Sequence, residues 1–376
     1  MANAYPNSVD VFVVGGGPAG LATAIAARRR GLTVMVADGA VPPIDKSCGE
    51  GLMPDGVEAL RALDISVPES EAYRFRGIRF VNEGVTAEAR FPRGTAYGIR
   101  RTHLHRIMTE HAEACGVDLL WRTPVSGLES GGVRVAGEVI RARWIIGADG
   151  TGSRVRRWAG LDRELGKSQG RNPRFAFRRH YQVHPWTEFM ELHWGRDCQI
   201  YVTPVSGEEV CVALVSSSPK LRLDDALGEF PELSENLGNA GYSSSERGAI
   251  TVTRRLRRVY RDRTLLVGDA SGGVDAITGE GLCLAFRQAA VLADCLADGN
   301  LARYQKEHRA IGRRPAAMSR MMLFLAKHGG LRRRAMRVFE SNPRVFAGML
   351  ALHLGDGSAR EHVASGIALG WELLTG

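Results

Sequence analysis

The chain has 376 residues, of which 44% are hydrophobic and 24% are charged, a composition typical of folded globular proteins. This length allows one large domain or two of ordinary size, and no window approaches the ~18 apolar residues needed to cross a bilayer. The formal charge of +9 suits an anionic partner, but no base-reading motif accompanies the arginines, so we expect no nucleic-acid partner.

The six cysteines are scattered along the chain, without a CxxC pair or any other metal-ligand spacing. This usage is typical of free thiols in a reducing compartment, and we expect no metal site. The amino terminus has no basic region followed by a long apolar stretch, so no secretory signal is evident. We therefore expect a cytoplasmic protein.

The first predicted elements are a strand over 9–14, a glycine-rich turn and a helix over 21–30. The turn has the pattern GxGxxG, and its residues are Gly15, Gly17, Pro18, Ala19 and Gly20. In such a turn the first glycine permits the tight bend, the second lets a pyrophosphate approach, and the third lets helix and strand pack.

A second strand over 33–37 ends at Asp38. A carboxylate at this place accepts a hydrogen bond from a ribose 2′-hydroxyl and repels a 2′-phosphate. These features predict a dinucleotide site, but they do not distinguish FAD from NAD.

Two further glycine clusters follow short apolar strands. One contains Asp149 and Gly150, and the other contains Gly268 and Asp269 and continues to Gly279-Glu280-Gly281. A glycine cluster after a strand brings backbone N–H groups close to a phosphate. Three such clusters, so far apart in the chain, indicate one long dinucleotide crossing one sheet, and this favours FAD.

The segments 144–156 and 263–270 resemble the DG and GD motifs of the single-component flavoprotein hydroxylases, which include p-hydroxybenzoate hydroxylase. The resemblance implies that Asp269 contacts the ribityl chain, that Arg101 lies near the FAD phosphates and that the backbone of Val125 meets adenine. It also implies that the helix predicted over 282–296 directs its positive end at the pyrimidine ring of the flavin.

Other segments are more similar to the geranylgeranyl reductases. These are the run 278–281 (Thr-Gly-Glu-Gly) and the run 46–51 (Lys-Ser-Cys-Gly-Glu-Gly). The reductases' Tyr-x-Trp-x-Phe-Pro motif is only partly kept over 199–204, and the Trp-x-Trp-x-Ile-Pro motif of flavin-dependent halogenases is absent. The sequence therefore lies between branches of one superfamily.

Three residues are candidates for catalysis. Cys48 and Glu50 belong to the segment that the reductases place beside the flavin, although Cys48 also suits a buried apolar thiol. Asp275 precedes the last glycine turn and suits proton transfer, or alternatively a hydrogen-bond acceptor at the start of a helix. His180, His193, Trp194 and Tyr201 lie on predicted strands, and none is singled out.

The predicted fold is α/β, with a Rossmann-like FAD-binding domain of the glutathione reductase type. We assign 1–70, 98–160 and 261–300 to this domain, 71–97 and 161–260 to an interleaved β-sheet substrate domain, and 301–376 to a C-terminal helical segment. Strands are predicted at 73–81, 189–194, 199–203 and 210–216 because apolar and polar residues alternate there.

The C-terminal segment places arginines beside the apolar run 321–325. This pattern fits a helix that contacts a membrane or an acyl carrier, or a helix that packs its apolar stripe on the core. The sequence does not predict the oligomeric state.

The leading functional hypothesis is an FAD-dependent monooxygenase that acts on an apolar aromatic or polyketide-like molecule, with O₂ and with NADH or NADPH as a transient electron donor. The alternatives are a reductase of isoprenoid double bonds, a flavin-dependent halogenase, and a flavoprotein without enzymatic activity.

Overall fold

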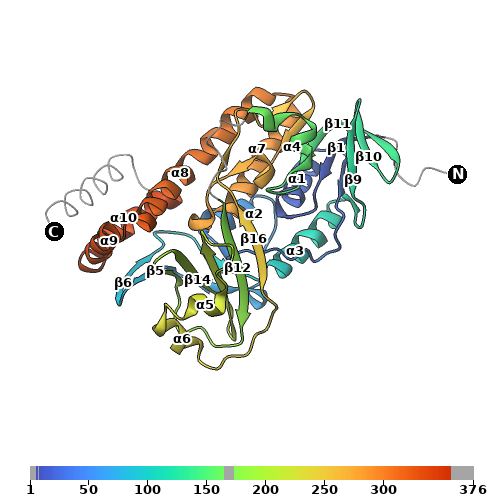
Figure 1. Cartoon of the computed structure of the whole chain (residues 1–376). Coiled ribbons are helices and arrows are strands. Elements are labelled where there is room, and N and C mark those ends of the chain that lie inside the picture. The colour runs from blue at the N-terminus through green and yellow to red at the C-terminus, as the bar shows by residue number, and fades with distance from the viewer. Residues whose placement is uncertain (1–5, 7, 165–172, 357–376) are drawn as a thin grey trace.

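The computed structural model describes residues 6, 8–164 and 173–356, in which two β-sheets are joined and covered by helices (Figure 1). The helices are α1 Pro18–Arg28, α2 Pro54–Arg61, α3 Arg101–Ala114, α4 Arg154–Trp158, α5 Leu223–Leu227, α6 Pro231–Leu237, α7 Gly281–Asp298, α8 Leu301–Lys327, α9 Gly329–Ser341 and α10 Pro343–Leu354. Short 3₁₀ helices are η1 Glu69–Glu71, η2 Leu161–Glu164, η3 Gly268–Ser271 and η4 Ala276–Thr278.

The first sheet has the strand order β18-β19-β11-β1-β2-β8, in which β19 to β8 are parallel and β18 is antiparallel to β19; the antiparallel strands β10 and β9 extend it from β11. Its strands are β1 Ser8–Val14, β2 Val34–Ala37, β8 Asp118–Leu120, β9 Val125–Glu129, β10 Gly132–Val135, β11 Glu138–Gly147, β18 Tyr260–Arg261 and β19 Thr264–Leu266. Every residue of β2 is buried, as expected for a parallel strand covered on both faces. Helices α1 and α7 pack against each other beside this sheet.

The second sheet is mostly antiparallel and has the order β16-β12-β15-β14-β13-β5-β6. Its strands are β5 Gly77–Asn82, β6 Val85–Arg90, β12 Arg174–Tyr181, β13 Met190–Trp194, β14 Cys198–Ser206, β15 Glu209–Ser216 and β16 Arg247–Thr251. One face packs on α5 and α6, and the other face looks toward the first sheet and the C-terminal helices. The predicted α/β architecture is confirmed, whereas the predicted domain boundaries stay a prediction.

The single strand predicted over 73–81 was wrong. The chain changes sheets at Arg76, so that β4 Tyr73–Phe75 pairs with β7 Ala96–Gly98 while β5 joins the second sheet. The Arg76 N–H bonds the carbonyl of Glu188, and its carbonyl accepts from the Phe91 N–H. The alternation of apolar and polar side chains continues through Arg76, and so the sequence pattern does not reveal that the chain changes sheets there. The small strands β3 Gly51–Leu52, β17 Arg254–Arg255 and β20 Gly272–Gly273 complete the description.

The C-terminal helices lie on the second sheet, where α9 and α10 contact β6 (Figure 1). Met322 and Leu325 of α8 are buried in the apolar cluster shared with the sheet, whereas Phe324 remains 52% exposed. Most of the apolar stripe is therefore used in packing, and a membrane or acyl-carrier contact stays a prediction. No helix among the described residues has both the length and the apolar character to cross a membrane.

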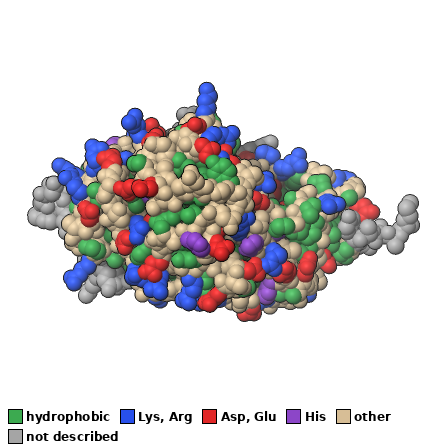
Figure 2. All heavy atoms as spheres, turned by 90° about the horizontal axis from the view of Figure 1, so that it is seen from below, with side chains coloured by type: hydrophobic (Ala, Val, Ile, Leu, Met, Phe, Trp, Pro, Cys, Tyr) green, Lys and Arg blue, Asp and Glu red, His purple; other side chains and the backbone are tan. Residues whose placement is uncertain are grey.

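Charges of both signs are interspersed on one face of the molecule. Figure 2 shows Lys and Arg side chains interspersed with Asp and Glu over the face seen from below. A block of one sign would attract nucleic acid, but mixed charges on this face do not favour it. That the protein has no nucleic-acid partner stays a prediction.

Candidate functional site

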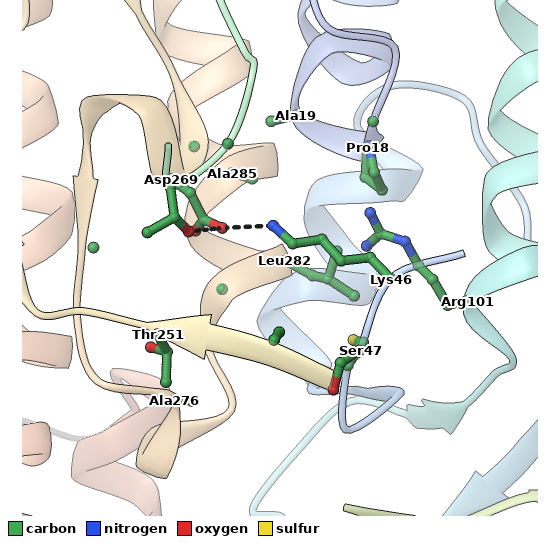
Figure 3. Close-up of a pocket in the computed structure, with 18 of the residues that line it drawn as sticks. Pro18, Ala19, Lys46, Ser47, Arg101, Thr251, Asp269, Ala276, Leu282 and Ala285 are labelled. Atoms are coloured by element: carbon green, nitrogen blue, oxygen red, sulfur yellow. Dashed lines mark hydrogen bonds and ion pairs between the residues drawn. The ribbon is translucent and has the colours of Figure 1, made fainter. Parts of the chain in front are cut away.

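A cavity of about 660 Å³ lies where the three glycine clusters meet the second sheet (Figure 3). Every residue that the sequence singled out for cofactor binding or catalysis lines it, except Gly20. Its other wall is formed by side chains of β12 to β15: Ala176, Met190, Tyr201, Ala213 and Val215. Segments far apart in the sequence thus form one elongated site.

The glycines of the first turn are required for different reasons. Gly15 has φ +109°, and a Cβ there would lie 2.6 Å from the Ala148 carbonyl oxygen. A Cβ on Gly20 would lie 1.9 Å from the carbonyl oxygen of Gly15, so Gly20 lets α1 approach the strand. Gly17 differs, because its Cβ would meet only the Arg101 Nη2 at 3.9 Å. No atom of the described residues therefore fills the space beside Gly17. A diphosphate bound at this turn requires that space.

Arg101 directs a half-buried cation into the same space. Its guanidinium lies beside Pro18 at the start of α1 (Figure 3), and its Nε has no hydrogen-bond partner among the described residues. Burial lowers the pKa of Arg101, since the charged form loses its water. A half-buried cation next to a helix N-terminus fits an anionic ligand such as a diphosphate.

The turn is held by two side chains. Asp38 Oδ2 accepts a hydrogen bond from the Gly16 N–H at 2.7 Å, and Oδ1 accepts from the Ala40 N–H at 2.8 Å. His105, one turn after Arg101 on α3, donates from Nε2 to the Gly16 carbonyl at 2.9 Å. Sequence reasoning missed His105, although its spacing of four residues from Arg101 places both on one face of the helix.

Asp149 serves as a helix cap. Its Oδ2 accepts hydrogen bonds from the backbone N–H groups of Arg154 at 2.6 Å and Val155 at 3.1 Å, at the start of α4. The carboxylate therefore fixes the turn that carries Gly150, which lines the cavity. The expected contact between Asp149 and the cofactor stays a prediction.

Asp269 lies across the cavity from Lys46, and the two groups form an ion pair at 3.4 Å (Figure 3). The Thr151 hydroxyl donates to the same carboxylate oxygen at 3.3 Å. The missed residue Arg156 joins the second and third clusters, since its Nη atoms donate to the carbonyls of Ala270 and Thr151 at 3.0 Å each. This arginine is fully buried, and no spacing in the sequence indicates its partners.

Glu50 lies in a buried network between α3 and the second sheet. One carboxylate oxygen accepts from the Arg101 N–H at 2.9 Å, and the other lies 2.6 Å from Nε2 of His180. Arg178 Nη1 lies 3.0 Å from His180 Nδ1, so Nδ1 accepts and Nε2 donates to Glu50. Both oxygens thus have protein partners, and a catalytic role for Glu50 stays a prediction.

Glu50, His180 and Cys211 place potential ligand atoms within 4.8 Å of one another. The Arg178 guanidinium, 3.9 Å from Glu50, already supplies the positive charge of this group. We therefore interpret it as a hydrogen-bonded network. Cys48 lies at its edge, where burial raises the pKa of its thiol. Such a thiol is a poor nucleophile.

Asp275 lies in the cavity wall and is buried. Its Oδ1 accepts from the Ile277 N–H at 3.0 Å, as in a cap of the short helix η4, and Arg174 lies 3.9 Å away. The Tyr201 hydroxyl donates to the Ile277 carbonyl at 2.6 Å. Tyr201 therefore presents its ring to the cavity, while its polar atom is already bonded.

Two of the strand residues considered from the sequence, His193 and Trp194, lie away from the glycine clusters. His193 and Trp194 occupy opposite faces of β13, as the alternation predicts. Nε2 of His193 lies 2.9 Å from Glu191, while the Trp194 ring packs with the C-terminal helices and lies beneath Arg332. Neither residue lines the cavity formed at the glycine clusters.

Comparisons with known proteins agree with this geometry. The profile of the family described as "FAD binding domain" matches residues 8–303. The menaquinone reductase of Mycobacterium tuberculosis is 27% identical over 320 residues, which cover 79% of this chain and 78% of the relative. The digeranylgeranylglycerophospholipid reductase of Methanocaldococcus jannaschii is 26% identical over 300 residues, covering 73% of each chain. The crystal structure of a flavoprotein/dehydrogenase from Cytophaga hutchinsonii superposes with a TM-score of 0.79 at 20% identity, covering 93% of both chains.

Proposed function

Starting from the fact that this chain belongs to the FAD-binding domain family and is an FAD-dependent oxidoreductase, we propose that it reduces a carbon–carbon double bond in an isoprenoid-like chain. The flavin supplies hydride chemistry when bound, and the protein orients the substrate and excludes water. The electron donor in this proposal is NADH or NADPH, which binds transiently because the one dinucleotide fingerprint in the sequence is assigned to FAD.

The observation that carries the proposal is the apolar wall opposite the glycine turns. Met190, Ala213 and Val215 face the cavity without a polar atom. The hydroxyl of Tyr201, which also lines this wall, is already bonded to the Ile277 carbonyl at 2.6 Å. A site built to bind a polar aromatic ring would offer free donors or acceptors to it, whereas this wall suits a hydrocarbon chain.

Different residues of the chain would bind different parts of FAD. Gly17, Arg101 and the N-terminus of α1 would hold the diphosphate, and Asp269 would contact the ribityl chain. The N-terminus of α7, which begins at Gly281, would direct the positive end of its helix dipole at the bound flavin. The names of the two curated relatives support reduction over the hydroxylation that the sequence alone placed first.

The test is a reaction of the reduced holoenzyme with a geranylgeranyl lipid or a menaquinone in the absence of oxygen. We expect the flavin to be reoxidised and the product to gain two hydrogen atoms on carbons of its isoprenoid chain, and not on the oxygens of the quinone ring. If the flavin is reoxidised only after oxygen is admitted and the product gains an oxygen atom, the proposal is wrong and the monooxygenase hypothesis is correct.

A pair of variants tests the wall itself. Ala213→Phe narrows the cavity and should raise KM for the lipid while FAD binding is unchanged. Tyr201→Phe keeps the ring and removes only the hydroxyl, so it serves as the matched control, with KM close to that of the wild type. Equal KM values for all three proteins would place the substrate elsewhere.

A further inference from the structure

Glu280 is a buried acid in the cavity that cofactor binding does not explain. It immediately precedes α7, its side chain is 6% exposed and it lines the cavity. Its Oε2 has no hydrogen-bond partner among the described residues. Burying a carboxylate with an unpaired oxygen is costly, so a group in this position favours its neutral, protonated form.

The charged groups around Glu280 come from four helices. Asp55 of α2 disfavours its ionisation, whereas Arg287 of α7 and Arg314 of α8 favour it. His353 of α10 places Nε2 3.8 Å from Oε1 of Glu280. Burial is the largest effect and, together with Asp55, raises the pKa of Glu280 to about 8.

His353 is held in the opposite state. Burial lowers the pKa of His353 to about 4, so the imidazole is neutral at neutral pH. Its Nδ1 has no partner among the described residues. At neutral pH the carboxyl group of Glu280 is therefore protonated at the cavity, and the neutral imidazole of His353 lies next to it.

We propose that Glu280 is the proton donor to the substrate and that His353 is a positioning residue that returns the proton. The proposal deepens and rests on the proposed reduction of a double bond. It assigns the catalytic acid to Glu280 and not to Asp275, because the Asp275 carboxylate accepts a backbone hydrogen bond while an oxygen of Glu280 is unpaired.

One carbon of the double bond receives the hydride of the reduced flavin, and its neighbour receives the Glu280 proton. The hydride would bring the two electrons that replace the π bond by two C–H bonds, and Glu280 is left as a carboxylate. His353 then relays a proton (H⁺) from the solvent to Glu280: its ring takes up one proton as Nε2 releases another to the carboxylate, and the ring returns to its starting tautomer before the next turnover.

The first experiment measures protonation in the FAD-free protein and so does not depend on activity. Glutamate carrying ¹³C at the side-chain carboxyl is incorporated, and the signal missing from Glu280→Gln is titrated. We expect that signal to show a protonated carboxyl at pH 7, with an ionisation well above that of an exposed glutamate. A Glu280 that is already ionised at pH 6 overturns the proposal, whatever the enzyme's activity.

The second experiment follows anaerobic reoxidation of the flavin by the lipid substrate. Glu280→Gln should slow this reaction by ~10²–10⁴-fold, the usual contribution of a general acid, while FAD affinity and reduction by dithionite stay unchanged. Glu235→Gln makes the same chemical change at an exposed position and is the matched control. His353→Asn should lower kcat with little change in KM and move the pH profile, which a purely structural role would not do.

The outcomes separate the two proposals. An active wild type with an equally active Glu280→Gln variant overturns the assignment of the acid and leaves the proposed function intact. A wild type that reduces no isoprenoid substrate overturns the proposed function and, with it, the role of Glu280. A variant that loses anaerobic reduction but keeps its flavin supports both.

Discussion

Replacing Gly17 by alanine should separate the stability of the fold from the binding of the cofactor. Gly17 has φ −72° and ψ 176°, a conformation that alanine adopts readily, and the new Cβ would contact only the Arg101 guanidinium at 3.9 Å. Such a substitution stabilises a protein by about 0.4–1 kcal/mol, because the unfolded chain loses freedom. We therefore expect the FAD-free variant to be at least as stable as the wild type.

The same methyl group occupies the space assigned to the diphosphate. Displacing the ligand sacrifices one or two hydrogen bonds to a charged group, each contributing about 1.5–3 kcal/mol. A loss of ~3 kcal/mol weakens FAD binding ~100-fold, and the bulkier Gly17→Val should yield colourless protein.

The assay pairs flavin titration of the FAD-free protein, followed by quenching of flavin fluorescence, with thermal unfolding of the same samples. Gly20→Ala is the contrasting control, because its Cβ would lie 1.9 Å from the Gly15 carbonyl oxygen. That variant should lose stability by ~3 kcal/mol or more. Wild-type FAD affinity in Gly17→Ala would refute the placement of the diphosphate at this turn.

Four further predictions concern buried polar groups. Arg101→Met should weaken FAD binding by tenfold or more, since charged hydrogen bonds contribute about 1.5–3 kcal/mol. The FAD-free variant should be no less stable than the wild type in thermal unfolding, and a loss of stability would mean that Arg101 serves the fold. Glu50→Gln should lower the free energy of unfolding in urea by about 3 kcal/mol, because its amide cannot accept from both the Arg101 N–H and His180; an unchanged midpoint would contradict the network. Glu280 has a pKa raised to about 8 in the folded protein, so the folded state holds its proton longer and stability falls as the pH rises from the unfolded value toward 8. Glu280→Gln removes this penalty and should stabilise the FAD-free protein by about 3 kcal/mol at pH 7 but hardly at pH 5, and an equal effect at both pH values would argue against it. The Cys48 thiol, whose pKa burial raises, should resist iodoacetamide at pH 8 in the native protein and react once the protein is unfolded, as peptide mass mapping would reveal.

The sequence revealed those parts of the site that are local in the chain. A strand, a glycine turn and a helix are encoded within about twenty residues, so the roles of Gly15 and Gly20 could be predicted from spacing alone. The motifs around Asp149 and Asp269 were recognisable for the same reason. In the structure these segments converge on one cavity.

The interactions that connect distant segments could not be predicted. Nothing near Glu50 in the sequence indicates that it will meet His180, and nothing near Glu280 indicates His353. These contacts depend on how β12 and α10 pack against the cofactor side of the molecule, which is tertiary information. Composition and periodicity describe each element, but they do not show which elements become neighbours.

The order of strands in the first sheet also affects how the chain folds while it is being synthesised. Val14 pairs with Gly147, and Gly147 in turn pairs with Leu266, so adjacent strands are separated by more than a hundred residues. A nascent chain that has not yet reached residue 266 exposes the open edge of β11, a surface prone to pairing with other chains. High contact order of this kind slows folding. A good yield of the protein should therefore require chaperones or a low growth temperature, which limit aggregation of the nascent chain until the third glycine cluster has been translated.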